Sequence, residues 1–199
     1  NSILDIGAGT GILALIMAQR STAELIDALE IDDDAYEQCV ENFETSDWGD
    51  RLFCYHASLD EFTAEIEDQY DLIISNPPFF TETFKTTNEV RNQARFEDAM
   101  PFTELIKSVS KLLSPNGEFN VIIPFSEEFS FTKLAAKEDL YPSKILNIRG
   151  QELSPVKRSL VCFTFKKQAV ETHELVIEIA RHQYTKEYTS LTKDFYLKL

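Results

Sequence analysis

The chain has 199 residues, of which 43% are hydrophobic, so it is long enough for one domain with a sizeable buried core. Its longest apolar run, Ile12 to Ala18, is far shorter than the ~20 residues that cross a bilayer, which argues against a membrane-spanning helix. The net charge of −15 argues at first against a nucleic-acid partner.

Apolar strand-like runs alternate with amphipathic segments of helical period along the chain. Strands are predicted at residues 2–7, 23–31, 51–57, 70–76, 118–124, 141–150 and 158–167, and helices at 10–20, 32–46, 102–113 and 127–139. The acidic residues 32–34 are expected to cap the second helix, and residues 114–117, SPNG, form a turn signal. This alternation predicts an α/β fold with a seven-stranded, mostly parallel sheet and helices on both faces. Gly150 and Pro155 predict a hairpin-like return that makes the last strand antiparallel.

Two segments do not follow the alternation. Residues 81–98 are polar and lack a strong period, and a connection of this length in a compact α/β domain is usually a lid over a site or disordered. Residues 184–199 are rich in aromatic side chains and are expected to pack as a helix against the sheet. Because the chain opens directly in a strand, we interpret residues 1–199 as one domain that lacks a short N-terminal segment.

The cysteines and histidines show no framework of disulfide or metal-ligand spacing. Scattered cysteines fit small core residues in a reducing compartment, so the sequence predicts a cytoplasmic protein without a metal site. The residues concerned are Cys39, Cys54 and Cys162, together with His56, His173 and His182, to which we assign no function.

Three glycines, Gly7, Gly9 and Gly11, lie between the first predicted strand and the first predicted helix. A tight strand-to-helix turn needs unusual backbone angles, and a ligand pressed against it leaves no room for a Cβ. The spacing G-x-G-x-G departs from the G-x-G-x-x-G of nicotinamide dinucleotide sites. Glu30 lies nineteen residues after Gly11, at the end of the second predicted strand, where a carboxylate can accept hydrogen bonds from both hydroxyls of a ribose.

This set of residues resembles that of the Rossmann-like, class I S-adenosylmethionine-dependent methyltransferases. The resemblance implies that Asp5 and the three glycines line the amino-acid part of the cofactor. It also implies that Glu30 holds the ribose and that Ile31 covers the adenine. In that class an acidic residue after the third strand often contacts the adenine amine; this sequence offers Ser58 at that place, or Asp60 slightly beyond.

The motif NPPF, residues 76–79, follows the fourth predicted strand. Methyl transfer from a sulfonium is an in-line displacement, so positioning carries most of the catalysis. An amide or exocyclic amine nitrogen is a poor nucleophile because its lone pair is delocalised, and acceptors aimed at its two hydrogens would favour a tetrahedral nitrogen. The Asn76 side-chain oxygen and the Pro77 carbonyl can be these acceptors, since the Pro77–Pro78 pair stiffens the turn. Phe79 offers a flat face for stacking, whereas Phe80 could belong to that face or to the core.

The motif resembles the [D/N/S]-P-P-[Y/F/W] signature of amino-methyltransferases, at the strand where that group has it. Two kinds of acceptor share this signature, adenine in nucleic acid and the glutamine amide in protein. Residues 91–95, 112–124 and 184–199 are similar to the corresponding segments of the bacterial valine-tRNA (adenine-N6)-methyltransferases, which modify the adenine that follows the anticodon. Members of that family also carry an N-terminal segment that helps to close over the cofactor.

The distribution of charge permits an RNA partner without demonstrating one. Residues 1–71 hold eighteen Asp and Glu against two basic residues, whereas residues 72–199 hold sixteen acidic and seventeen basic residues. One face could therefore bind a polyanion while the acidic half turns away. The resemblance implies phosphate contacts near the pocket, with a footprint that could extend further along the chain; the residues are Lys85, Arg91 and Arg95, then Lys157 and Arg158.

The resulting hypothesis is a monomeric enzyme that uses S-adenosylmethionine to methylate N6 of a tRNA adenine next to the anticodon. The alternative is N5-methylation of a glutamine side chain in a protein such as a release factor. A third interpretation is a catalytically silent binding module that keeps the fold, although the intact glycines, Glu30 and Asn76 argue against it.

Overall fold

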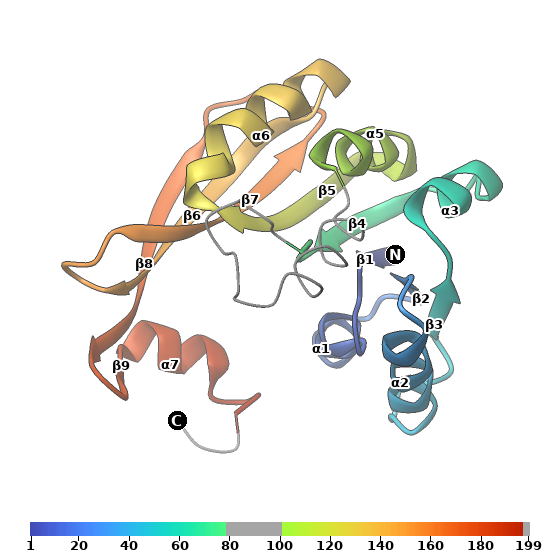
Figure 1. Ribbon diagram of the computed structural model, residues 1–199, viewed down its shortest axis with the longest axis horizontal. Helices are drawn as coiled ribbons and strands as arrows, with labels where there is room; N and C mark the ends of the chain where they lie inside the picture. Colours follow the sequence, from blue (N-terminus) through green and yellow to red (C-terminus); the bar gives the residue numbers. More distant parts are fainter. Residues whose placement is uncertain (79–100, 197–199) are drawn as a thin grey trace, which may run out of the picture.

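The computed structural model describes residues 1–78 and 101–196 (Figure 1). Its strands are β1 Ser2–Ile6, β2 Leu25–Glu30, β3 Leu52–His56, β4 Tyr70–Ser75, β5 Leu113–Pro124, β6 Tyr141–Gln151, β7 Val156–Thr164, β8 Glu171–Ala180 and β9 Gln183–Tyr184. Its α-helices are α1 Ile12–Arg20, α2 Asp33–Glu44, α3 Leu59–Glu65, α5 Phe102–Leu112, α6 Glu128–Ala135 and α7 Lys186–Thr192.

The strands form one sheet in the order β3-β2-β1-β4-β5-β7-β6-β8-β9. The five strands from β3 to β5 are parallel, β7 runs antiparallel to both β5 and β6, and β8 runs parallel to β6. Helices α1 and α2 cover one face, and α3, α5 and α6 cover the other (Figure 1). The α/β fold, the mostly parallel sheet and the antiparallel β7 confirm the predicted fold class.

Each face of the sheet has its own hydrophobic core, because successive side chains of a strand point to opposite faces. Ile3 and Ile26 pack with Ala14 of α1 and Phe43 of α2. On the other face the strands contribute Leu4, Leu29 and Ile73, which pack with side chains of α3, α5 and α6. Burial of each large apolar side chain stabilises the fold by about 1.5–3 kcal/mol. Strands β1 and β2 are therefore buried on both sides, which explains their almost uninterrupted apolar sequences.

The described strands number nine rather than the predicted seven, because β8 and β9 extend the sheet beyond β6. In the sequence of β8, ETHELVIEIA, the first four and the last two residues are exposed and only Leu175 is buried, so it carries a weak strand signal. The SPNG turn is a bulge within β5: Tyr70 pairs with Leu113, whereas Leu72 pairs with Glu118. The predicted C-terminal helix is present as the shorter α7.

No helix in the described residues is long and apolar enough to cross a membrane.

A buried polar pair lies beneath the α3–α5 side of the sheet. The Tyr70 hydroxyl donates a hydrogen bond of 2.5 Å to Asp27 Oδ2, and Asp27 is only 3% exposed. Its other carboxylate oxygen has no partner among the described residues. Burial raises the pKa of Asp27, against the lowering effect of the Tyr70 hydroxyl. The fold therefore favours the protonated carboxyl.

We expect this pair to make stability depend on pH. Because the pKa of Asp27 is raised on folding, its ionisation destabilises the folded state progressively as pH rises from about 4 through the folded pKa. Asp27→Asn cannot ionise, so its stability in urea unfolding should fall less than that of the wild type as pH rises above about 4. Tyr70→Phe is the matched control. It leaves the Asp27 carboxylate without its hydrogen-bond donor and should lower the free energy of unfolding by about 1–3 kcal/mol at neutral pH. Parallel pH profiles for Asp27→Asn and the wild type would contradict this account.

Candidate active site

The strand order reverses direction at β1, which lies between β2 and β4. In open parallel sheets ligands bind at such a switch point, in the crevice outside the carboxyl ends of the strands. The turn after β1, the loop after β2 and the segment after β4 all emerge at this edge. The candidate site is built from these three connections.

The glycine turn has the backbone conformation that the sequence predicted. Gly7, Gly9 and Gly11 have φ angles of 71°, 57° and 82°, all in the left-handed region that favours glycine. A Cβ added at Gly7 or Gly9 would meet no described atom within 4 Å, so open space adjoins both residues. Gly11 is different, because its Cβ would lie 2.6 Å from the Phe43 ring and 2.7 Å from Cys39 Sγ. The first two glycines thus leave room for a ligand, and the third allows α1 to pack on α2.

Glu30 ties the glycine turn to the loop after β2. Its Oε2 accepts a hydrogen bond of 2.6 Å from the N–H of Gly9, and its Oε1 accepts 2.9 Å bonds from the N–H groups of Ile31 and Asp32. The side chain of Ile31 is 61% exposed at the site edge. Glu30 and Ile31 are therefore adjacent to the glycine turn. This position is the one they would need if Glu30 bound the ribose of the cofactor and Ile31 covered its adenine.

Asp5 is fully buried in β1, just before the turn, and neither carboxylate oxygen has a hydrogen-bond partner among the described residues. Burial is the main reason why the pKa of Asp5 is raised to about 7. The backbone N–H of Ala14, in the first turn of α1, opposes this rise, and the Glu30 carboxylate adds to it. Asp5 thus lies just before the turn but is closed off from solvent in the described residues, so its contact with the amino-acid part of the cofactor stays a prediction.

Ser58 is already engaged in the structure. It is the N-cap of α3, where its hydroxyl accepts from the N–H of Glu61 and donates to the Glu61 carboxylate at 2.8 Å. Such a capping box stabilises the helix start, so a cofactor contact by Ser58 stays a prediction. Asp60 is exposed in the first turn of α3. Asp32 caps α2 by accepting from the N–H of Ala35, which confirms the capping expected for that run.

The segment after β4 lies directly beside the glycine turn. Ser75 pairs with Ile6 across the two strands, and its buried hydroxyl donates a 2.8 Å hydrogen bond to the Ile6 carbonyl. Asn76 follows Ser75 just as Gly7 follows Ile6, so the two connections leave neighbouring strands at the same level. Asn76 is exposed and Pro77 is buried. The structure thus brings Asn76, Pro77 and the exposed Pro78 to the edge that carries the turn.

The predicted lid at residues 81–98 lies outside the described residues. So do five residues predicted to act on the substrate: Phe79, Phe80, Lys85, Arg91 and Arg95. Their roles stay predictions. Arg158 pairs with Pro124, the last residue of β5, so Lys157 and Arg158 lie at the carboxyl-end edge of the sheet, on the β7 side of β4.

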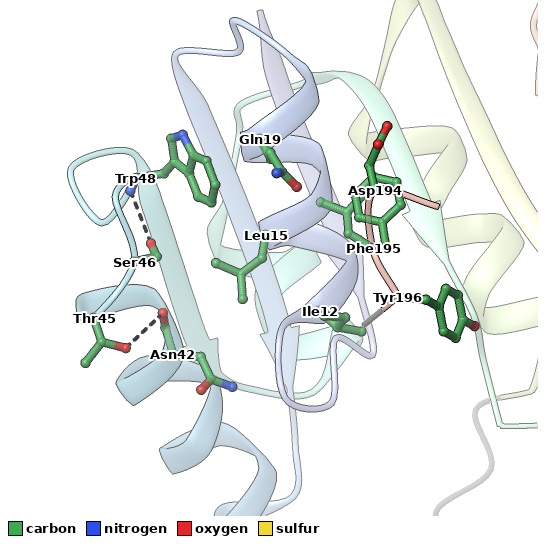
Figure 2. A pocket seen from close by; sticks show the side chains of 11 residues that line it. Ile12, Leu15, Gln19, Asn42, Thr45, Ser46, Trp48, Asp194, Phe195 and Tyr196 are labelled. Atoms are coloured by element: carbon green, nitrogen blue, oxygen red, sulfur yellow. Dashed lines mark hydrogen bonds between the residues drawn. The ribbon is translucent and has the colours of Figure 1, made fainter. Parts of the chain in front are cut away.

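A hollow of about 530 Å³ lies on the outer side of α1, away from the sheet (Figure 2). Ile12, Leu15 and Trp48 line it together with the C-terminal residues Asp194 to Tyr196. The Arg20 guanidinium lies 5.6 Å from the centre of the Phe195 ring. The end of the described chain therefore contacts the helix that begins at the glycine turn.

Sequence reasoning assigned no role to His56, yet this residue contacts the loop that follows Glu30. Its Nε2 lies 3.0 Å from the Ile31 carbonyl oxygen and 3.1 Å from Asp33 Oδ1. The partners come from an element about 25 positions earlier in the chain. The register of two adjacent parallel strands brings the ends of β2 and β3 together, and no local feature of the sequence indicates this pairing.

Fold and site together define a Rossmann-like methyltransferase. Residues 1–132 match the methyltransferase small domain family. Two solved structures share the fold with this chain at low sequence identity. One is a predicted O-methyltransferase from Agrobacterium tumefaciens (TM-score 0.71, 18% identity, covering 96% of this chain and 88% of that one). The other is an S-adenosylmethionine-dependent methyltransferase from Clostridium acetobutylicum (TM-score 0.58, 12% identity, covering 82% of this chain and 83% of that one).

Relatives of higher sequence identity identify the family within this class of methyltransferases. A tRNA1(Val) (adenine(37)-N6)-methyltransferase from Flavobacterium johnsoniae is 62% identical over 100% of this chain and 85% of its own length. One from Christiangramia forsetii is 59% identical over 100% of this chain and 84% of its own. The chain belongs to the tRNA1(Val) (adenine(37)-N6)-methyltransferase family. These comparisons confirm the predicted family, enzyme class and cofactor.

We expect the glycines of the turn to respond differently to alanine. At Gly7 only the positive φ angle opposes a side chain, so Gly7→Ala should lower the free energy of unfolding by about 1–2 kcal/mol. At Gly11 the same strain combines with the clash against Phe43 and Cys39, so a further loss of about 1–3 kcal/mol should appear. Urea unfolding of Gly7→Ala and Gly11→Ala measures the difference. Equal losses of stability would show that the packing of α1 on α2 does not depend on Gly11.

Proposed function

We propose that the chain transfers the methyl group of S-adenosylmethionine to N6 of adenine 37 in tRNA1(Val), the reaction for which its relatives are named. The observation that carries the proposal is the bond between Ser75 and Ile6. It holds an Asn-Pro-Pro segment, suited to a planar amine, beside a glycine turn suited to the cofactor. Donor and acceptor can then meet at one edge of the sheet.

The cofactor supplies an electrophilic methyl group on a sulfonium. Gly7 and Gly9 leave space for its amino-acid part, and Asp5 offers negative charge to the ammonium group. Glu30 accepts from the ribose hydroxyls, while Ile31 covers the adenine. Because Glu30 also binds the Gly9 N–H, ribose binding and the shape of the turn are linked.

Asn76 and Pro77 hold the target amine. The Asn76 Oδ1 and the Pro77 carbonyl accept hydrogen bonds from the two N6 hydrogens, and Phe79 stacks on the adenine. The nitrogen lone pair forms the new N–C bond as the C–S bond breaks, and S-adenosylhomocysteine leaves. The proton departs to solvent after the nitrogen has become cationic, so no general base is required before attack.

An RNA substrate must present adenine 37 outside its stack. Unpaired bases of an anticodon loop leave the stack at lower cost than bases of a duplex. In this proposal Pro78 and Phe80 line the base pocket, while Lys85, Arg91 and Arg95 contact phosphates. A tRNA substrate also accords with the predicted cytoplasmic location, and a single chain holds the complete set of proposed residues, in accord with a monomer.

We expect Asn76→Ala to lower the rate of methyl transfer by about 10²-fold or more, because one of two acceptors for the amine is lost. Since Asn76 is exposed, the variant should fold normally and bind S-adenosylhomocysteine like the wild type. Asn76→Asp keeps an acceptor oxygen in the same place and should retain more activity. Single-turnover transfer of labelled methyl measures the rates. An unchanged rate in Asn76→Ala would remove this residue from catalysis.

The choice between RNA and protein can be tested with one labelled cofactor and two acceptors. We expect label in unmodified tRNA1(Val), recovered as N6-methyladenine, and none in a release factor that bears an unmodified glutamine. Binding of the tRNA should weaken steeply with salt, because phosphate contacts release counterions. Label in the protein, with tRNA inert, would overturn the proposed substrate while leaving the methyltransferase assignment intact.

A further inference from the structure

His56 is the last residue of β3 and lies directly opposite Glu30 in the register of β2 and β3. Glu30, the proposed ribose ligand, therefore has His56 as its neighbour in the sheet. On the opposite side of Glu30 lies the glycine turn. His56 thus belongs to the adenosine side of the candidate site by its position alone.

The side chain of His56 makes three contacts with the segment that follows Glu30. Its Nε2 lies 3.0 Å from the Ile31 carbonyl and 3.1 Å from Asp33 Oδ1. Its ring stacks on Tyr36, with centroids 4.9 Å apart and planes inclined by 19°. A carbonyl oxygen only accepts hydrogen bonds, so Nε2 must carry a proton for this bond to form. The imidazole thereby joins the end of β3 to the loop after β2 and to α2.

The backbone of Ile31 is consequently held at both of its polar groups. Its N–H donates to Glu30 Oε1 at 2.9 Å, and its carbonyl accepts from His56 Nε2. With both groups fixed, the peptide units on either side of Ile31 have little freedom to rotate, and the exposed side chain projects in a defined direction. An apolar side chain that covers an adenine ring binds it more tightly when it is held in place beforehand in this way.

The contacts of His56 contribute little to the fold itself. The side chain is 41% exposed and that of Asp33 is 86% exposed, and polar pairs as exposed as this one contribute little to the stability of a protein. Neither residue belongs to a core cluster of the described residues. The Ser58 hydroxyl, predicted to serve the adenine, is occupied by Glu61. Among the described residues, His56 makes the polar contact that joins the end of β3 to the Ile31 carbonyl.

We propose that His56 is a positioning residue for the adenosine half of the cofactor: by holding the Ile31 carbonyl it sets the loop on which the adenine rests. This inference rests on the proposed placement of S-adenosylmethionine. It assigns no step of methyl transfer to His56. Its effect should therefore appear in cofactor affinity and in KM for S-adenosylmethionine, and not in kcat or in KM for tRNA.

Two variants separate the hydrogen bond from the stacking. His56→Phe keeps a ring against Tyr36 and loses the donor, whereas His56→Gln keeps an N–H donor and loses the ring. His173→Phe is the matched control, because His173 is an exposed histidine near the start of β8, remote in the sheet order from β2 and β3. The urea midpoints of all three variants should remain close to that of the wild type, which shows that each has folded.

Calorimetric binding of two ligands is the first measurement. S-adenosylhomocysteine probes the whole cofactor site, and 5′-methylthioadenosine contains the adenosine half without the amino acid. We expect His56→Phe to weaken both ligands by a similar factor of about 10, the equivalent of one lost hydrogen bond. His56→Gln should recover most of the affinity, and His173→Phe should bind like the wild type. Steady-state kinetics should show the change in KM for S-adenosylmethionine alone.

Three results would overturn the inference. Unchanged affinity of His56→Phe for both ligands would show that the loop is set without the imidazole. Weaker binding of S-adenosylhomocysteine with unchanged binding of methylthioadenosine would place the effect at the amino-acid end. A fall in kcat with unchanged affinity would assign His56 to another step. Failure of the wild type to bind either ligand would instead refute the placement of the cofactor, and the inference with it.

Discussion

The carboxylate of Glu30 is the interaction on which the site depends. It accepts three backbone hydrogen bonds, one from the glycine turn after β1 and two from the loop after β2. Hydrogen bonds to a charged acceptor are roughly twice as strong as neutral ones, so this one side chain joins the two connections firmly. The shape of the turn, the direction of Ile31 and the start of α2 all follow from it.

A second bond, from Ser75 to Ile6, has the same role on the other side of β1. It is buried, and it fixes the level at which β4 ends relative to β1. The two sets of hydrogen bonds act on different parts of the site. Those of Glu30 shape the part that suits the nucleoside of the cofactor, and that of Ser75 sets the position of Asn76 beside the methyl acceptor. Methyl transfer needs its two reactants aligned to within fractions of an ångström, and strand register is the most rigid frame that a protein can offer for that purpose.

The parts of the structure that could be predicted from sequence are those specified locally. Gly7, Gly9 and Gly11 carry their own conformational signal, and the alternation of strands and helices identified the sheet up to β7. Ser58 shows the limit of this reasoning, because a serine after a strand suits a ligand contact as well as a helix cap, and only Glu61 three residues later favours the cap. His56 could not be recognised, since its partners belong to a distant segment. The strand β8 was missed because only Leu175 is buried and the first four residues, Glu171 to Glu174, are all exposed.

The contact between the end of the described chain and α1 has a consequence for synthesis on the ribosome. Strands β1 to β4 and the helices between them come from the first 75 residues, so this half of the sheet can begin to form early. The outer side of α1 waits longer, because Asp194 to Tyr196 lie far along the chain from α1 and are synthesised much later (Figure 2). Until these residues have left the ribosome, Ile12 and Leu15 face water or a chaperone. The nascent chain thus shows an apolar stripe that the finished molecule partly covers.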